Sequence, residues 1–333
     1  MVFQREEFIK SIFQISSAQE FNELALKLFH YQAEHLLAYR EFLSLIQTHP
    51  SDITSKEEIP FLPIRFFKDR SLLISEKKAE TIFRSSGTTS AQTSEHHVAD
   101  LKLYEHSFTT YFEMVYDQCS ELEILALLPS YLERSDSSLV YMVNSLIERT
   151  ESEHSGFYLQ NYQELLAKIK ELQQKSKPII LFGVTFALLD IATHYPNTNW
   201  DSLTIIETGG MKGRGKELTR AELHHELYSK LNPDHIHSEY GMTELLSQAY
   251  SSGDIFTPPP WMKISTREID DPFSTQEFNK TGGINIIDLA NVDSCAFIAT
   301  DDLGQVDDAG RFKVLGRFDH SDVRGCNLMV QNY

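Results

Sequence analysis

Cysteine is scarce in this sequence, because Cys119, Cys295 and Cys326 are its only examples among 333 residues. An odd number of widely spaced cysteines offers neither a disulfide framework nor a Cys-x-x-Cys pair for zinc. Such a composition fits a reducing compartment, so we expect a cytoplasmic protein. We interpret Cys119 and Cys295 as buried apolar side chains, which is the usual role of unpaired cysteines.

Basic residues are outnumbered by acidic ones, and long apolar runs are absent from the sequence. The chain has 30 Lys and Arg against 48 Asp and Glu, which gives a formal net charge of −18. Affinity for phosphate backbones comes mainly from Lys and Arg, so the composition argues against a nucleic-acid partner. No run approaches the roughly 18 apolar residues of a membrane span. The start, MVFQREEFIK, has early charges and no apolar signal core, so we expect neither a span nor a leader.

What the sequence does contain is a succession of helical and strand-like patterns. Apolar residues recur at three- and four-residue steps over 5–47, which predicts helix there. The segment EEIPFLPIRFF at 57–67 holds two prolines and is expected to be extended. Over 79–231 strand-like runs alternate with helical patterns, which predicts an α/β fold with a mostly parallel sheet. One tight turn is expected near Gly183, between a strand and a helix.

The pattern changes near residue 250. Three consecutive prolines stand in DIFTPPPWMKI, and the runs GGINIIDL, CAFIATDDLG and GRFKVLGRF that follow are short and β-rich. We therefore expect one domain over 1–333. It should comprise a helical region at 1–80, an α/β core at 81–250, and a small β subdomain with a hinge-like tail at 251–333.

A loop rich in hydroxyl groups follows the apolar run AETIF. It reads SSGTTS and contains Ser85, Ser86, Gly87, Thr88 and Thr89, without an acid or a lysine. Hydroxyls and bare backbone N–H groups are neutral donors that suit phosphate oxygens. A flexible linker would have a similar composition, so the loop by itself leaves both interpretations open.

A second phosphate candidate is the segment GGMKGRGKE. Gly210, Gly215 and Lys216 match the G-x-x-x-x-G-K skeleton of a P-loop, between a predicted strand and helix. Glu217 stands where a P-loop needs Ser or Thr for magnesium, and its charge would repel phosphates. An ordinary turn with solvated basic residues explains the segment equally simply, and we favour the hydroxyl-rich loop.

Three further stretches carry groups that suit a nucleotide. In HSEYGMTEL, Tyr240 could stack on a purine and Thr243 could donate to a phosphate oxygen. Glu244 offers Mg²⁺ a hard oxygen ligand. In ATDDLG, Asp302 could accept from two ribose hydroxyls, and in VLGRFD Arg317 could bind phosphate or ribose. The alternatives are structural: a hairpin turn for TDDLG, and a surface ion pair between the arginine and the aspartate of GRFD.

Taken in order, SSGTTS, TGG, YGMTE, TDDLG and GRFD resemble the motifs of adenylate-forming enzymes, the superfamily of acyl-CoA synthetases, peptide-synthetase adenylation domains and luciferases. The resemblance implies their large α/β domain with a small β subdomain. It also implies ATP and Mg²⁺, with Thr243 and Glu244 as catalytic residues and Glu244 as the metal ligand. The nucleotide-binding residues that it implies are Ser85, Ser86, Gly87, Thr88, Thr89, Gly209, Gly210, Tyr240, Gly241, Asp302 and Arg317.

Within that superfamily the sequence is most similar to the acyl-protein synthetases of LuxE type, through IPFLPIRFF, TGGMKGRGKEL, HSEYGMTELLSQAY and VRGCNLM. This implies activation of a carboxylic acid, expected to be a fatty acid, as an acyl-adenylate. The acyl group would pass to Cys326 and then to a protein acceptor such as an acyl reductase or a carrier.

Two departures from the superfamily pattern keep alternatives open. The hydroxyl-rich loop is followed by Ser90, Ala91, Gln92 and Thr93, where relatives have a lysine that holds the triphosphate. The expected C-terminal lid domain, which builds the thioester-forming face, does not follow the hinge motif. A CoA ligase and a non-catalytic nucleotide- or acyl-binding subunit therefore remain possible interpretations. The sequence does not specify the acid, its chain length or the acceptor.

Overall fold

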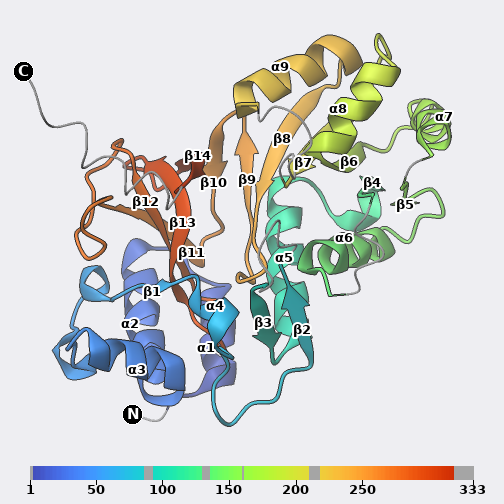
Figure 1. Ribbon diagram of the computed structural model, residues 1–333. Coiled ribbons are helices and arrows are strands. Elements are labelled where there is room, and N and C mark those ends of the chain that lie inside the picture. Colours follow the sequence, from blue (N-terminus) through green and yellow to red (C-terminus); the bar gives the residue numbers. More distant parts are fainter. Residues whose placement is uncertain (1–2, 86–92, 130–135, 160, 210–217, 319–333) are drawn as a thin grey trace, which may run out of the picture.

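The computed structural model describes residues 3–85, 93–129, 136–159, 161–209 and 218–318. It shows a mixed α/β fold around one large sheet, as the sequence predicts (Figure 1). Twelve strands belong to this sheet, and most follow the order β11-β12-β13-β14-β10-β9-β8-β7-β6-β4-β5. β8 pairs in parallel with β7 and antiparallel with β9, so it joins a parallel half to an antiparallel half.

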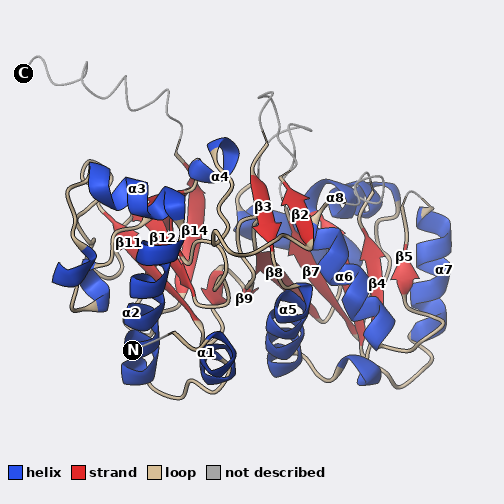
Figure 2. Ribbon diagram, turned by 90° about the horizontal axis from the view of Figure 1, so that it is seen from below, coloured by secondary structure: helices blue, strands red, loops and turns tan. Residues whose placement is uncertain are grey.

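The N-terminal region is helical, as the periodicity over 5–47 predicts. It is divided into α1 (Arg5–Ile12), α2 (Ala18–His35) and α3 (Leu37–Leu45). Ser17 starts α2 because its side chain accepts from the Glu20 N–H while the Glu20 side chain returns to the Ser17 backbone. Leu36 ends α2 with an extended backbone. These helices lie beside β11–β13 in both views (Figures 1 and 2).

The next segment is extended only in part. Two short 3₁₀ helices, Pro50–Asp52 and Lys56–Glu58, precede β1 (Leu62–Pro63), which pairs in parallel with β13. The expectation of an extended chain fails after Pro63, where α4 (Phe66–Asp69) forms. A separate hairpin of β2 (Thr81–Arg84) and β3 (Glu95–Val98) then lies between the two halves of the molecule (Figure 2).

The parallel half contains the buried apolar runs. Its strands are β4 (Glu123–Leu127), β5 (Gly156–Phe157), β6 (Ile179–Val184), β7 (Leu203–Thr208) and β8 (His235–Tyr240). The helices that accompany them are α5 (Leu101–Val115), α6 (Ser138–Arg149), α7 (Tyr162–Leu172), α8 (Thr185–His194) and α9 (Arg220–Leu231), with a 3₁₀ turn at Cys119–Glu121. Every residue of β4 and β6 is buried, which explains why their sequences are apolar except for Glu123 at the start of β4.

The expected tight turn between strand and helix near Gly183 is confirmed, because β6 ends at Val184 and α8 begins directly at Thr185. Gly183 itself lies within β6. A Cβ at Gly183 would come within 2.6 Å of the Leu188 side chain, so the glycine serves the packing of α8 onto its own strand.

The remaining strands are antiparallel, so the prediction of a mostly parallel sheet holds only for one half. They are β9 (Ala249–Ser252), β10 (Ile255–Thr257), β11 (Met262–Arg267), β12 (Gly282–Asp288), β13 (Phe297–Val306) and β14 (Phe312–Arg317). The TDDLG segment lies within β13, so the hairpin-turn interpretation is wrong.

The fold also shows where the two cysteines of the core lie and how long and apolar the helices are. Cys119 and Cys295 are 1% and 0% exposed, which confirms that they are core side chains. Among the described residues, no helix combines the length and apolar character that a membrane crossing requires.

Candidate active site

The candidate site forms where the two halves of the sheet meet. Tyr240 ends β8, and Thr208 ends the neighbouring strand β7 just before Gly209. The carboxyl ends of parallel strands share one edge of a sheet, and such edges commonly bind ligands. β13 and β14 bring Asp302 and Arg317 to the same place from the antiparallel half.

Tyr240, Asp302 and Arg317 form a linked group. The Tyr240 hydroxyl donates to Asp302 Oδ2 at 2.8 Å, and Arg317 Nε lies 3.2 Å from Asp302 Oδ1. Asp302 and Arg317 are direct partners across β13 and β14. The surface pair between Arg317 and the aspartate of GRFD that the sequence left open involves Asp319, outside the described residues. Burial raises the pKa of Asp302, although Arg317 and the tyrosine hydroxyl oppose the shift.

The environment of Tyr240 differs from that of an exposed stacking platform. Its side chain is 8% exposed, and its ring packs edge-on against Phe256 and Phe312 at centroid distances of 5.8 and 5.2 Å. The Arg317 side chain is 73% exposed, so its guanidinium keeps access to a charged ligand while it contacts Asp302. The three residues thus combine a buried acceptor with an exposed cation.

The base of the hydroxyl-rich loop is closed by two serines. The Ser94 N–H donates to Ser85 Oγ at 2.9 Å, and the Ser85 N–H donates to the Ser94 carbonyl at 3.0 Å. Of the predicted loop residues, Ser86, Gly87, Thr88 and Thr89 lie outside the described residues. The same holds for Gly210, for the competing P-loop segment up to Glu217, and for Cys326.

Glu244 lies directly beside this hairpin. Its side chain is 5% exposed, and Ser94 donates a hydrogen bond to its carboxylate. Burial raises the pKa of Glu244, while the Ser94 hydrogen bond and Arg317 favour the ionised form. Asn291 Nδ2 donates to the Glu244 carbonyl at 2.9 Å. Thr243, next to it, is half-buried, and its carbonyl faces His96.

Gly209 and Gly241 differ in the structural feature that each position shows. Gly209 has φ +76, a left-handed conformation that favours glycine, and its carbonyl accepts from Thr185 Oγ1 at 2.9 Å. A Cβ at Gly241 would collide with Glu239 Oε1. The backbone of Gly209 thus favours glycine, whereas a Cβ at Gly241 would press on the end of the Glu239 side chain.

Sequence reasoning missed a carboxylate in the middle of the site. Glu239 immediately precedes Tyr240, and its Oε2 accepts from Thr208 Oγ1 at 2.5 Å. Burial, with a smaller contribution from the nearby Glu207, raises the pKa of Glu239 to about 7. An acid inside the strand sequence HIHSEY was the available signal, because glutamate is uncommon within strands and loses hydration at a half-buried position.

Ser94 and His96 were missed as well. In the structure Ser94, His96 and Val98 share one inward face, at 3, 1 and 2% exposure, but the sequence SEHHV has no alternation of apolar and polar residues that would have shown it. Over the described residues there is no group of three or more His, Cys, Asp or Glu side chains that could hold a metal ion. Glu244 could hold a cation together with substrate phosphates and water, a ligand set that Mg²⁺ commonly takes.

The whole chain matches a known protein family. The family model described as acyl-protein synthetase, LuxE, matches residues 1–333. The chain belongs to the LuxE acyl-protein synthetase family. A search of curated proteins found no match. The family model therefore confirms the resemblance that the five motifs had indicated.

Solved structures show that this family member shares its fold with adenylate-forming ligases. A 2-hydroxyisobutyryl-CoA ligase in an open conformation with 2-HIB-AMP and CoA has a TM-score of 0.67 and 12% identity, covering 91% of this chain and 71% of that one. O-succinylbenzoate coenzyme A synthetase (MenE) from Bacillus subtilis, in complex with AMP, has a TM-score of 0.52 and 18% identity, covering 74% and 50%.

ATP-bound MatB from Rhodopseudomonas palustris gives a similar result, with a TM-score of 0.50 and 17% identity, covering 71% of this chain and 47% of that chain. The chain thus spans about half the length of MatB and of MenE. At these identities the comparison shows the fold alone, which is that of the large domain of adenylate-forming enzymes.

Proposed function

We propose that this protein activates a carboxylic acid, a fatty acid in particular, with ATP and transfers the acyl group to a cysteine. Membership of the acyl-protein synthetase family supports the reaction class. The observation that carries the assignment of the site is the group formed by Tyr240, Asp302 and Arg317, which joins three separately predicted motifs. Thr243 and Glu244 lie on the same edge, beside the hydroxyl-rich hairpin.

The donor set suits a bound nucleotide. The Asp302 carboxylate would accept from adjacent ribose hydroxyls, with Tyr240 fixing one of its oxygens and Arg317 contributing positive charge. Glu244 would ligate Mg²⁺ together with phosphate oxygens, and the metal would offset charge on the triphosphate. Ser85 and the rest of the loop 85–89, with Gly209, Gly210 and Gly241, would line the phosphate path.

The chemistry divides into two displacements. A carboxylate oxygen forms a bond to the α-phosphorus of ATP while the bond to the β-phosphate bridge breaks, and pyrophosphate leaves. The thiolate of Cys326 then forms a bond to the acyl carbonyl carbon, and AMP leaves with the electron pair of the broken bond. Preorganised donors stabilise charge at the crowded phosphorus, and removing one such donor typically lowers the rate by ~10²–10³-fold.

Cys326 is proposed as the acceptor from the sequence and the family. It follows Arg317 by nine residues. At ~3.3–3.6 Å per extended residue, this tether reaches about 30 Å, which is enough to return to the nucleotide site. Arg324 would favour the thiolate, the form that attacks. A short tether makes the attack effectively intramolecular and favours transfer over hydrolysis. The acyl group would then pass to a partner protein.

An exchange assay tests the first step. Purified protein with ATP, Mg²⁺ and a panel of fatty and aromatic acids should incorporate labelled pyrophosphate into ATP in an acid-dependent manner. No exchange and no hydroxamate trapping across the panel would leave only a binding role.

Labelling tests the second step. ATP and a labelled acid should leave hydroxylamine-sensitive label on the protein, and Cys326→Ser should remove it while exchange continues. Label that persists as a thioester in this variant would exclude Cys326, and release of acyl-CoA with added CoA would favour a CoA ligase.

A further inference from the structure

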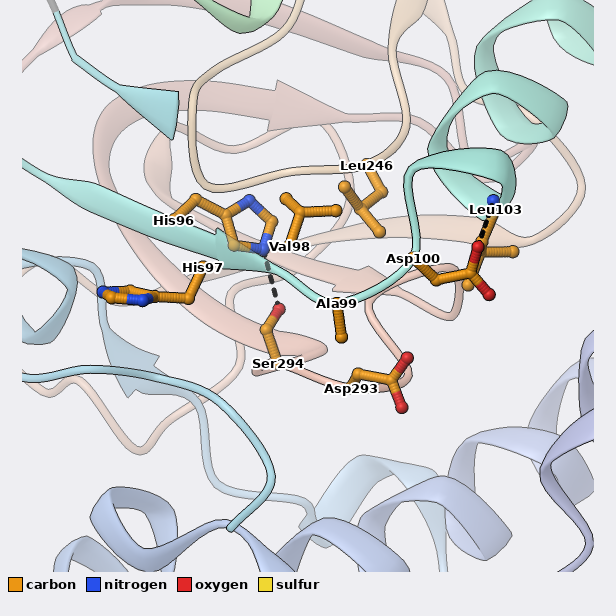
Figure 3. A pocket seen from close by; sticks show the side chains of 9 residues that line it. All are labelled: His96, His97, Val98, Ala99, Asp100, Leu103, Leu246, Asp293 and Ser294. Atoms are coloured by element: carbon orange, nitrogen blue, oxygen red, sulfur yellow. Dashed lines mark hydrogen bonds between the residues drawn. The ribbon is translucent and has the colours of Figure 1, made fainter. Parts of the chain in front are cut away.

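His96 occupies a position that the proposed chemistry does not use. It lies on the inward face of β3, between Ser94 and Val98, and is 1% exposed. Its ring packs edge-on against Phe67 at 5.6 Å. Figure 3 shows the side chain turned toward Ser294, while the neighbouring His97 points away. A histidine buried this completely needs a partner for each ring nitrogen.

Both nitrogens have partners from other parts of the chain. His96 Nδ1 lies 2.8 Å from the Thr243 carbonyl, and Nε2 lies 2.9 Å from Ser294 Oγ. Because a carbonyl only accepts, Nδ1 carries the proton and Nε2 accepts from the serine hydroxyl. Burial lowers the pKa of His96 to about 4, so the ring keeps this neutral form near pH 7.

The partner Ser294 belongs to a loop that is itself anchored. On α2, Gln32 Nε2 donates to the Asn291 carbonyl at 2.7 Å, and Gln32 Oε1 accepts from the Ala296 N–H at 3.0 Å. Asn291 Nδ2 in turn donates to the Glu244 carbonyl at 2.9 Å. The histidine therefore bridges a hairpin and a fixed loop.

These contacts converge on two consecutive peptide groups. His96 holds the Thr243 carbonyl, Asn291 holds the Glu244 carbonyl, and Ser94 binds the Glu244 carboxylate. Ser94 also closes the base of the hydroxyl-rich loop through Ser85. The inward face of β3 thus connects that loop to the segment carrying Thr243 and Glu244.

We propose that His96 is a positioning residue that fixes the Thr243–Glu244 backbone relative to Ser85 and Ser94, at the base of the β2–β3 hairpin, through its Nδ1–H hydrogen bond. The proposal rests on the proposed function, because these two segments are the ones assigned to phosphate and metal. His96 acts through Thr243 and does not touch the nucleotide. A misplacement of about 1 Å in such a segment can lower turnover by ~10²-fold.

Two amide substitutions separate positioning from simple filling of the core. In His96→Asn the amide nitrogen lies close to the place of Nδ1 and can still donate to the Thr243 carbonyl. In His96→Gln the amide lies close to the place of Nε2, so the bond to Ser294 is kept and the bond to Thr243 is lost. A small cavity of about 10 Å³ beside the ring, room for roughly one water, gives either side chain space to settle.

Acid-dependent pyrophosphate exchange is the first readout. We expect His96→Gln to lower kcat by roughly 10²-fold. The KM for ATP should change little, because Asp302 and Arg317 are untouched, and His96→Asn should retain most of the wild-type rate. His97→Asn is the matched control, since that neighbour faces Glu95 at 3.5 Å and should leave kcat unchanged. Thermal unfolding should show similar destabilisation in the two His96 variants.

Hydrogen–deuterium exchange of the peptide covering 240–247 is the second readout and needs no activity. Protection should fall in His96→Gln and persist in His96→Asn. Equal kcat losses in both variants that follow their melting temperatures, or equal protection in both, would overturn the positioning role. If the wild type shows no pyrophosphate exchange with any acid, the proposed function fails, and the protection pattern still decides whether His96 holds this segment.

Discussion

The parallel strands β4–β8 and the antiparallel strands β9–β14 share one sheet, yet they bring different groups to the candidate active site. The parallel half contributes Thr208, Gly209 and Glu239, a carboxyl group whose pKa is raised to about 7. The antiparallel half contributes Asp302 with the exposed cation Arg317.

The difference follows from the partners of each carboxyl group. Burial and the nearby Glu207 raise the pKa of Glu239 against the Thr208 hydrogen bond alone, whereas Arg317 opposes the effect of burial on Asp302. In β13 buried residues alternate with half-buried ones, and β14 is exposed toward its end, which leaves water for a charged pair. The antiparallel half thus carries the ion pair of Asp302 and Arg317, while the junction after β8 carries Glu244.

The largest effect on turnover is expected from Glu244, at the junction after β8. Replacing Glu244 with Gln removes the proposed metal ligand, so exchange turnover should fall by roughly 10²–10³-fold with little change in ATP affinity. Excess Mg²⁺ should partly restore turnover. Exchange kinetics over a Mg²⁺ titration measure this, and a variant with wild-type turnover at limiting Mg²⁺ would exclude Glu244 as a ligand.

A smaller effect is expected from the charged pair of the antiparallel half. Asp302→Ala removes the ribose acceptor and leaves Tyr240 and Arg317 without this carboxylate. A hydrogen bond to a charged group contributes about 1.5–3 kcal/mol, so ATP should bind roughly 10–150-fold more weakly. Calorimetric titration with ATP measures the loss. Asp308→Asn, on the exposed turn after β13, is the control, and equal affinities in the two variants would contradict the ribose assignment.

In the parallel half, the raised pKa of Glu239 should appear in the pH dependence of folding stability. The folded state raises the pKa of Glu239 from 4.5 to about 7, so the proton is held more tightly after folding. Stability from this group is therefore complete below pH 4.5 and is lost as the pH rises through 7.

Glu239→Gln removes this titration. Relative to the wild type, the variant should gain free energy of unfolding between pH 5 and 8, by at most about 3 kcal/mol, and less because Glu239 keeps some exposed surface. Urea unfolding at both pH values measures the change, with Glu7→Gln on α1 as the control. If the free energy of unfolding differs between wild type and variant by the same amount at both pH values, the pKa of Glu239 is not raised by folding.

The smallest effect concerns the buried thiols of both halves. Burial raises the pKa of Cys119 and of Cys295 to about 12. In a Cys326→Ser background, a thiol reagent at pH 8 should therefore label neither residue until the protein is unfolded. Rapid labelling of the native variant would mean that one of these cysteines is accessible and competes as an acyl acceptor.

Much of the fold could be predicted because its signals are local. The apolar runs at β4, β6 and β7 and the helical periodicity of α5 and α6 predicted those elements directly. The break at Ser17 within the first helical stretch was missed, since apolar periodicity continues through a capping box. The tight turn near Gly183 was predicted, but the packing of Leu188 against that glycine was not, because it depends on how α8 lies on β6.

For the site, the sequence by itself determined the motifs, their order and the family. It led us to propose Tyr240, Glu244, Asp302 and Arg317 as site residues, because each lies in a short segment whose residue types suit a nucleotide. Only the tertiary structure decided that Asp302 contacts both Tyr240 and Arg317, that Thr208 binds Glu239, and that His96 bridges Thr243 and Ser294. These pairs are separated by 15 to 198 positions. Which of them meet depends on strand order and on burial, and neither is a property of any local segment.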